Sequence, residues 1–108
     1  MAFDAGFFQQ VLPERVALEC EGHPESVPVV QVHLANGTVL DLCHIVHLAD
    51  AWFAVQHFRD ARTCADMDTV FLPYGLVAMV TVSLHHPASR RVGFSVQPKP
   101  KAVEAPGL

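Results

Sequence analysis

The amino-acid sequence predicts a small antiparallel β-barrel with a short helix at its N-terminus. Three observations lead to this fold class: apolar and polar residues alternate over several short runs, an Asn-Gly pair separates the first two runs, and the runs are rich in β-branched and aromatic residues. Alternation with a period of two is typical of half-buried strands, and Asn-Gly is the strongest short hairpin signal. The 108 residues suffice for one domain with one core, which we expect to span residues 1–96.

The N-terminal helix is expected over residues 3–12. Asp4 can cap its first turn, and apolar side chains recur along one face as far as Leu12. Pro13 is expected to end the helix, because proline lacks an amide hydrogen and its ring clashes with the preceding turn. For residues 14–20 the sequence allows two interpretations, an extension of the helix or a short strand.

Five strands are expected after the helix, and the first two meet in a hairpin at Asn36-Gly37, whose residues tolerate the positive φ of primed turns. A helix is the competing interpretation for residues 45–58, which contain no Gly or Pro, but their Val, Ile, Trp and Phe content favours strands. Residues 91–96 are a candidate sixth strand, and the Pro-rich residues 97–108 are expected to form a flexible tail. The expected strands span 29–34, 38–48, 51–58, 69–72 and 76–84.

Composition and charge limit the function classes. Charged residues make up 17% of the chain and the formal net charge is −4, so the basic surface of a general nucleic-acid binder is missing and no DNA partner is expected. Three cysteines do not make a secreted disulfide framework. The N-terminus lacks the pattern of a signal peptide, and no apolar run reaches the ~20 residues of a membrane helix. We therefore expect a cytoplasmic protein without a membrane partner.

Short motifs within residues 3–84 carry a resemblance to a known family. They are Glu25-Ser26-Val27-Pro28-Val29, Val32-His33-Leu34-Ala35-Asn36-Gly37, Asp50-Ala51-Trp52-Phe53 and Val70-Phe71-Leu72-Pro73-Tyr74, the last leading into Leu76-Val77. Together with a helix followed by five strands, they resemble the Sm-like fold, and most closely the bacterial Sm-like RNA chaperones. The resemblance implies a homo-oligomeric ring in which edge strands of neighbouring subunits pair. Such pairing would also protect the exposed edges of a small open barrel.

The resemblance implies RNA as a ligand, but this sequence keeps only some of the residues that the family uses to bind it. Trp52 stands where the family has a base-stacking aromatic residue, and we expect Tyr74, Asp50 and Asn36 to lie near the same ligand. The alternative for both rings is packing at a barrel rim or a subunit interface. The asparagine that the family places after Asp50 would fall on Ala54, and the family's lysine–histidine pair before the last strand is missing. The second hairpin is also slightly longer than the family pattern.

Seven histidines and three cysteines raise a second function class, a small metal-binding or enzymatic protein. Cys20-x-x-His23 and Cys43-x-x-x-His47 have spacings that a metal could use, and Cys64 could add a thiolate. On an extended strand, however, Cys43 and His47 would lie about 13 Å apart, too far to share one ion. We therefore assign no metal ligand, no catalytic residue and no cofactor.

The sequence also lacks the local motifs of common enzyme classes: a hydrolase elbow, a phosphate-binding glycine loop, a Rossmann fingerprint and a zinc-protease motif. The expected function is a non-catalytic, oligomeric binding or scaffolding module, with RNA as the ligand that the resemblance implies. The metal-binding or enzymatic protein is kept as the alternative.

Overall fold

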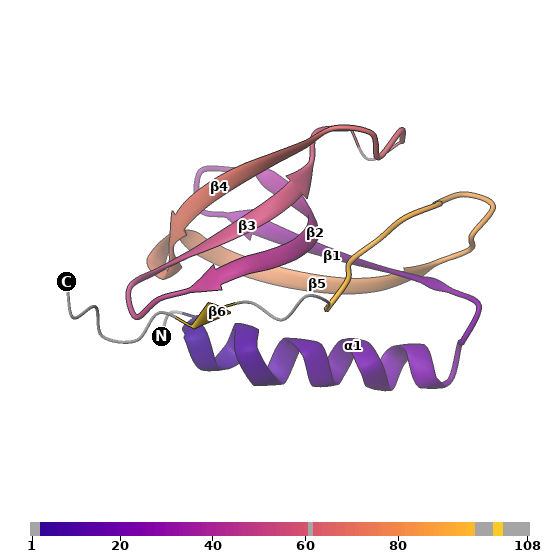
Figure 1. The fold of residues 1–108 in the computed structure, drawn as a ribbon, viewed down its shortest axis with the longest axis horizontal. Helices are drawn as coiled ribbons and strands as arrows, with labels where there is room; N and C mark the ends of the chain where they lie inside the picture. Colours follow the sequence, from indigo (N-terminus) through magenta and orange to yellow (C-terminus); the bar gives the residue numbers. More distant parts are fainter. Residues whose placement is uncertain (1–2, 61, 97–100, 103–108) are drawn as a thin grey trace.

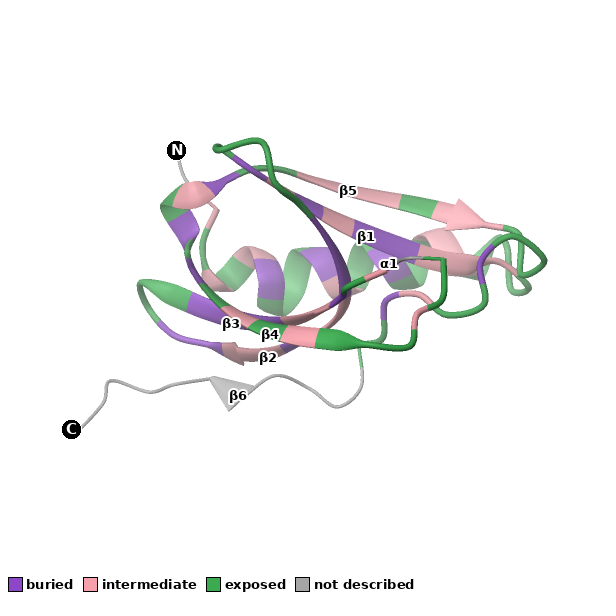
Figure 2. Ribbon diagram, turned by 90° about the horizontal axis from the view of Figure 1, so that it is seen from above, coloured by how far each residue is buried: buried purple, intermediate pink, exposed green. Residues whose placement is uncertain are grey.

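The structure, a computed structural model, describes residues 3–60, 62–96 and 101–102. Five antiparallel strands form one curled sheet, and an N-terminal helix packs along it, which confirms the prediction of a mainly β chain (Figure 1, Figure 2). The sheet order is β4-β3-β2-β1-β5. The strands span Val27–Leu34 (β1), Val39–Leu48 (β2), Trp52–Phe58 (β3), Met67–Pro73 (β4) and Val77–His85 (β5).

The N-terminal helix continues to Glu21, so the prediction that Pro13 ends it is wrong. Leu12 donates its backbone N–H to the carbonyl of Phe7, five residues earlier, which makes the preceding turn π-helical. Pro13 therefore falls in the first turn of the α-helical part, where the missing amide hydrogen costs little. Residues 14–20, which the sequence left open, are helical. The two parts are η1 (Phe7–Val11) and α1 (Leu12–Glu21).

One face of this helix is buried against the sheet. Phe8, Leu12 and Val16 recur every fourth position and are all 5% exposed or less. Burying one such side chain contributes about 1.5–3 kcal/mol, and this packing stabilises a helix that would be marginal alone. The predicted cap is confirmed, because Asp4 Oδ1 accepts a hydrogen bond of 2.9 Å from the backbone N–H of Phe7.

The first hairpin forms where it was predicted, but with a different turn. Of the residues in this turn, only Gly37 has a positive φ, of 91°, and its N–H donates to the carbonyl of Leu34 at 3.0 Å. Asn36 instead accepts a side-chain hydrogen bond of 3.0 Å from the N–H of Thr38. The connection is thus a three-residue loop that ends in a left-handed glycine, and not a primed turn.

Strand β2 leaves β1 soon after this hairpin. It pairs with β1 only through residues 39–41 and pairs with β3 from Leu42 onward, whereas β1 pairs with β5 along its whole length. The register between β2 and β3 shifts between Leu42 and His44 and again between Ile45 and His47. Each shift inserts one residue that bends the strand. A gap consequently opens between β1 and the second half of β2.

The C-terminal strap, residues 90–95, fills this gap. Phe94 donates its N–H to the carbonyl of Pro28 in β1 at 2.8 Å, and Ser95 donates to the carbonyl of Cys43 in β2 at 2.8 Å. The side chain of Phe94 is 7% exposed and belongs to the main core. The strap therefore joins two strands that no longer pair with each other.

The candidate sixth strand at 91–96 does not form, and Val92 and Val96 are exposed. A two-residue strand, β6 (Lys101–Ala102), instead runs parallel to β2 beside His47 and Leu48. The rest of the predicted tail lies outside the described residues. Within the part of the chain that the structure describes, no helix combines the length and apolar character needed to cross a membrane.

Strands β4 and β5 lie at the two ends of the sheet. No backbone pairing joins them within residues 3–60 and 62–96, so hydrogen bonds do not close the sheet into the predicted barrel there. Among the described residues, each of these strands therefore has one edge without a neighbouring strand. The side chains of the sheet point either to the core face, as Phe53 and Val55 do, or to the opposite outer face.

Candidate functional site

A row of three rings crosses the outer face of β2, β3 and β4. Trp52 stacks on His47 with ring centroids 5.4 Å apart and an interplanar angle of 14°, and it lies 5.8 Å from the tilted ring of Phe71. Trp52 is 39% exposed and Phe71 is 66% exposed. We call these three residues the outer aromatic row. It places the predicted Trp52 on an accessible aromatic surface.

Tyr74 lies in the core and not on that surface. Its ring stacks on Phe53 at 4.8 Å and lies 6.1 Å from Phe8, and it is 5% exposed. Its hydroxyl donates a hydrogen bond of 2.7 Å to the carbonyl of Ala49, and burial raises the pKa of Tyr74 to about 12. The Tyr74 ring is thus packed against core side chains and is not presented on the outer surface with Trp52.

The two predicted polar residues lie in turns that flank one short segment. The turn that holds Asn36 is tied to the segment η2 (Tyr74–Leu76) because Ala35 donates its N–H to the carbonyl of Leu76 at 2.8 Å. The turn that holds Asp50 is tied to the same segment by the Tyr74 N–H, which lies 3.4 Å from the carbonyl of Ala51. Asn36 and Asp50 are both exposed. The sheet therefore gathers these turns around η2.

Most of the described arginines have carboxylate partners. Arg59 is held by Asp68 at 2.8 Å, and this hydrogen-bonded ion pair lowers the pKa of Asp68. The other pairs are Arg15–Glu19 at 3.0 Å, Arg62–Asp60 at 3.7 Å and Arg90–Asp41 at 2.5 Å. A phosphate backbone approaching these groups would compete with carboxylates already in place. This arrangement offers weak electrostatic attraction for nucleic acid.

The pair between Arg90 and Asp41 is buried and was not predicted. Asp41 Oδ1 and Oδ2 accept hydrogen bonds of 2.5 and 2.9 Å from the guanidinium, and Arg90 Nε donates to the carbonyl of Val92 at 2.7 Å. The two residues are only 7% and 8% exposed, and the guanidinium lies 5.4 Å from the ring centre of Phe58. The sequence held one signal, an aspartate inside the apolar run of β2, but nothing in the sequence identified its partner.

The cysteines and histidines do not form a metal centre in the described part of the chain. Across residues 3–60 and 62–96, no three His, Cys, Asp or Glu side chains gather closely enough to hold one ion. Cys43 lies at a bulge with its Sγ 3.4 Å from His44 Nδ1, and burial, followed by the nearby Cys64, raises the pKa of the Cys43 thiol. Cys20 lies on α1 beside an apolar groove next to the C-terminal strap. These described residues therefore provide no set of metal ligands that would support the metal-binding alternative.

Comparison of this chain with models of known protein families, with curated proteins and with solved structures found no match.

Proposed function

We propose that this chain is an Sm-like module that self-associates through its two edge strands and acts as a non-catalytic binding or scaffolding platform. The observation that carries the proposal is the sheet order, which leaves β4 and β5 as end strands with different unpaired edges among the described residues. Two different edges favour a head-to-tail contact, in which β4 of one copy pairs with β5 of the next.

Two further features support the Sm-like assignment. A capped N-terminal helix precedes five antiparallel strands, as the resemblance implies. The two one-residue insertions in β2 lengthen the second hairpin, which accounts for its departure from the family pattern without a change in strand order.

The edge strands also carry exposed apolar side chains. Phe71 and Met67 of β4 are 66% and 44% exposed, and Met79 of β5 is 49% exposed. All three alternate with residues that face the core, so they share the outer face. Apolar side chains that gather along an unpaired edge are typical of an interaction surface.

The position of Trp52 favours RNA as the ligand. Trp52 is covered by His47 on one side and keeps about two-fifths of its surface exposed. Stacking of a base on such a ring contributes ~1–3 kcal/mol. Because four described arginines are already paired, we expect stacking to contribute more to RNA binding than phosphate contacts do.

Light scattering on the purified full-length chain, with the ultraviolet absorption spectrum read across the same peak, tests this proposal. A mass of several copies supports self-association, and a nucleic-acid spectrum on that peak supports RNA, with Trp52→Ala as the next variant. A multimer free of nucleic acid favours scaffolding. A monomer at all concentrations overturns the proposal, and elemental analysis for bound metal then tests the alternative.

A further inference from the structure

We propose that Cys64 and Cys43 form a redox-active pair that reacts with low-molecular-weight disulfides, and that the disulfide formed between them fastens the C-terminal strap to the sheet. Cys64 lies in the loop between β3 and β4, and Cys43 lies in β2 at the first of its two bulges. The structure holds both residues as thiols. The pair uses neither the outer aromatic row nor the unpaired strand edges, so it is independent of the proposed function.

The strap brings the two cysteines to one place. The Sγ atom of Cys64 lies 3.8 Å from the carbonyl oxygen of Val92. The backbone carbonyl of Cys43 accepts a hydrogen bond of 2.8 Å from the N–H of Ser95, only three residues further along the strap. Burial raises the pKa of Cys43, and the nearby Cys64 raises it further, so the two thiols are close enough for their charges to interact.

The guanidinium of Arg90 lies beside this pair. Its Nε donates a hydrogen bond of 2.7 Å to the same Val92 carbonyl that Cys64 approaches. Its pKa is raised most by the hydrogen bond to Asp41 and also by the side chain of Cys64. Asp41 in turn stands two residues before Cys43 in β2. The thiolate is the reacting form of cysteine, and a neighbouring arginine is typical of reactive cysteines.

The backbone of Cys64 is strained. Its φ is 53°, in the left-handed region that L-residues other than Asn and Asp rarely adopt, and it is the one non-glycine residue with a positive φ in the described part of the chain. Its N–H donates to the carbonyl of Asp60 at 2.9 Å, which holds this conformation. Strain of this kind concentrates at functional sites. We therefore assign the first attack to Cys64.

The reaction takes two thiol–disulfide exchanges. First, the Cys64 thiolate attacks one sulfur of the small disulfide, whose S–S bond breaks, and one half leaves as a thiolate. Next, Cys43 loses its proton to His44 Nδ1, which lies 3.4 Å from its Sγ, and attacks the Cys64 Sγ. The mixed disulfide breaks and the second half leaves. Two protein thiols are thereby oxidised, the small disulfide is reduced to two thiols, and the protons of the cysteines pass to the leaving thiolates.

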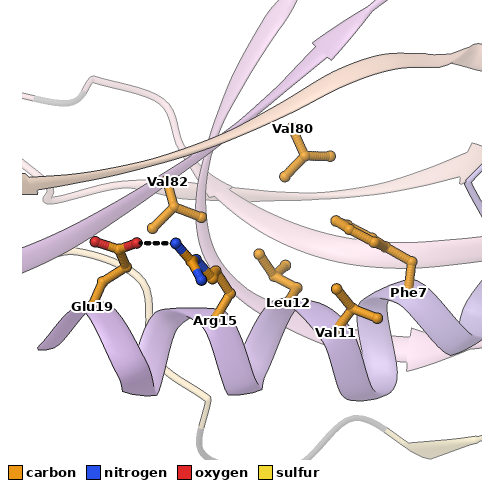
Figure 3. Close-up of a pocket in the computed structure, with 7 residues that line it drawn as sticks. All are labelled: Phe7, Val11, Leu12, Arg15, Glu19, Val80 and Val82. Atoms are coloured by element: carbon orange, nitrogen blue, oxygen red, sulfur yellow. Dashed lines mark ion pairs between the residues drawn. The ribbon is translucent and has the colours of Figure 1, made fainter. Parts of the chain in front are cut away.

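The third cysteine provides a matched control. Cys20 is partly exposed, like the other two, and lines an apolar groove between α1 and the strap in which no other described thiol takes part. A second groove, between the helix and β5, has no cysteine in its described lining: Figure 3 shows apolar side chains there and the ion pair between Arg15 and Glu19. Cys20 is thus a thiol without a second thiol in its groove.

Oxidised glutathione, mixed with reduced glutathione at neutral pH, tests the pair in the folded full-length chain. The wild type and Cys20→Ser should both form the disulfide between Cys43 and Cys64, which peptide mapping under non-reducing conditions identifies. Cys43→Ser should stop at a mixed disulfide on Cys64. Cys64→Ser should react about tenfold more slowly than Cys20→Ser, because its remaining thiols lack the arginine contact. Circular dichroism checks that each variant is folded.

Hydrogen exchange tests whether the disulfide fastens the strap. In the oxidised chain we expect the amides of Phe94 and Ser95 to exchange about tenfold more slowly, because a covalent link then joins β2 to the loop that contacts the strap at Val92. Cys43→Ser, treated in the same way, is the control. It keeps the backbone carbonyl that Ser95 binds but forms no link, so its exchange should not slow.

The Cys43–Cys64 disulfide in the wild type and in Cys20→Ser, together with slower exchange in the strap, supports the proposal. A disulfide that includes Cys20, one that joins two chains, or one that forms only in urea overturns the redox pair. A wild type that stops at the mixed disulfide overturns Cys43 as the second thiol. Unchanged exchange at Phe94 and Ser95 in the oxidised chain overturns the fastening of the strap.

Discussion

A single buried carboxylate determines where the C-terminal strap attaches. Asp41 stands in the apolar run of β2, and burying its charge is unfavourable unless a cation reaches it. Arg90 is that cation, and it also holds the carbonyl of Val92, so the pair fixes the start of the strap. Asp41 therefore has a structural role in β2, which the alternation of apolar and polar residues alone does not predict.

Asp41→Ala should lower the free energy of unfolding by about 3 kcal/mol, because it leaves the Arg90 charge buried without a partner. Adding Arg90→Met to that variant should recover part of the loss, since the unpaired charge is then gone. Urea unfolding measures both. Asp68→Ala, which breaks the exposed pair with Arg59, is the control and should change stability much less. If Asp41→Ala and Asp68→Ala lowered the free energy of unfolding equally, the burial of the Asp41–Arg90 pair would have no special effect on stability.

Tyr74 should make stability fall at alkaline pH. Its native pKa is raised to about 12 by burial, against about 10 for an exposed tyrosine. Because the native state holds this proton more tightly, the contribution of Tyr74 to the free energy of unfolding is constant below about pH 10 and falls from there to about pH 12.

Since Tyr74 is the chain's single tyrosine, its phenolate absorbance reports the titration directly. Tyr74→Phe should remove the alkaline loss of stability and retain only the cost of the missing hydrogen bond to Ala49. A native titration midpoint near that of free tyrosine would contradict the buried position.

At the scale of elements, the close approach of the strap to β1 depends on Gly93. A Cβ at this position would lie 1.9 Å from the carbonyl oxygen of Pro28, so any side chain forces the strap outward. We expect Gly93→Ala to cost about 1–3 kcal/mol of stability, as overpacking does in well-packed interiors. Gly22→Ala is the control, because no atom lies within 4 Å of its Cβ. Urea unfolding together with hydrogen exchange at the Phe94 amide measures the effect, and an unchanged exchange rate would contradict it.

The elements that the sequence predicted are those set by local chemistry. Alternating apolar residues and the Asn36-Gly37 pair placed the strands and the first hairpin, and Asp4 placed the helix start. Pro13 does not end the helix as predicted, because the usual rule assumes α-helical hydrogen bonds on both sides of the proline. A π-helical turn precedes this proline instead.

The strap was harder to predict for a different reason. Its Phe94 and Ser95 each bond to a different strand, so its conformation is determined by a gap between β1 and β2 that exists only after the sheet has formed. The same limit applies to the site, because Trp52 is exposed on the outer face of the sheet and Tyr74 is buried in the core, and this difference is established only when the sheet forms. Residue type alone does not distinguish them.

At the scale of the whole molecule, charge and shape favour different partners. The chain has a formal net charge of −4, and four of its described arginines are engaged with carboxylates. Long-range attraction to a polyanion is therefore weak. The open edges and their apolar side chains, in contrast, suit a second copy of the same chain. Self-association would also repeat the outer aromatic row once per copy, so several weak stacking contacts could act together on one ligand.

This balance predicts that RNA binding should depend only weakly on salt. For single strands, the logarithm of the association constant falls with the logarithm of salt concentration by about 0.7 for each phosphate neutralised. We expect a slope of magnitude below about 1.5 per copy, since stacking on Trp52 involves no counterion release. Fluorescence anisotropy of a labelled single-stranded RNA of mixed sequence measures the slope. Trp52→Ala should weaken binding about tenfold or more while leaving the slope unchanged. A steep slope that persists in Trp52→Ala would show that phosphate contacts, and not the outer aromatic row, hold the RNA.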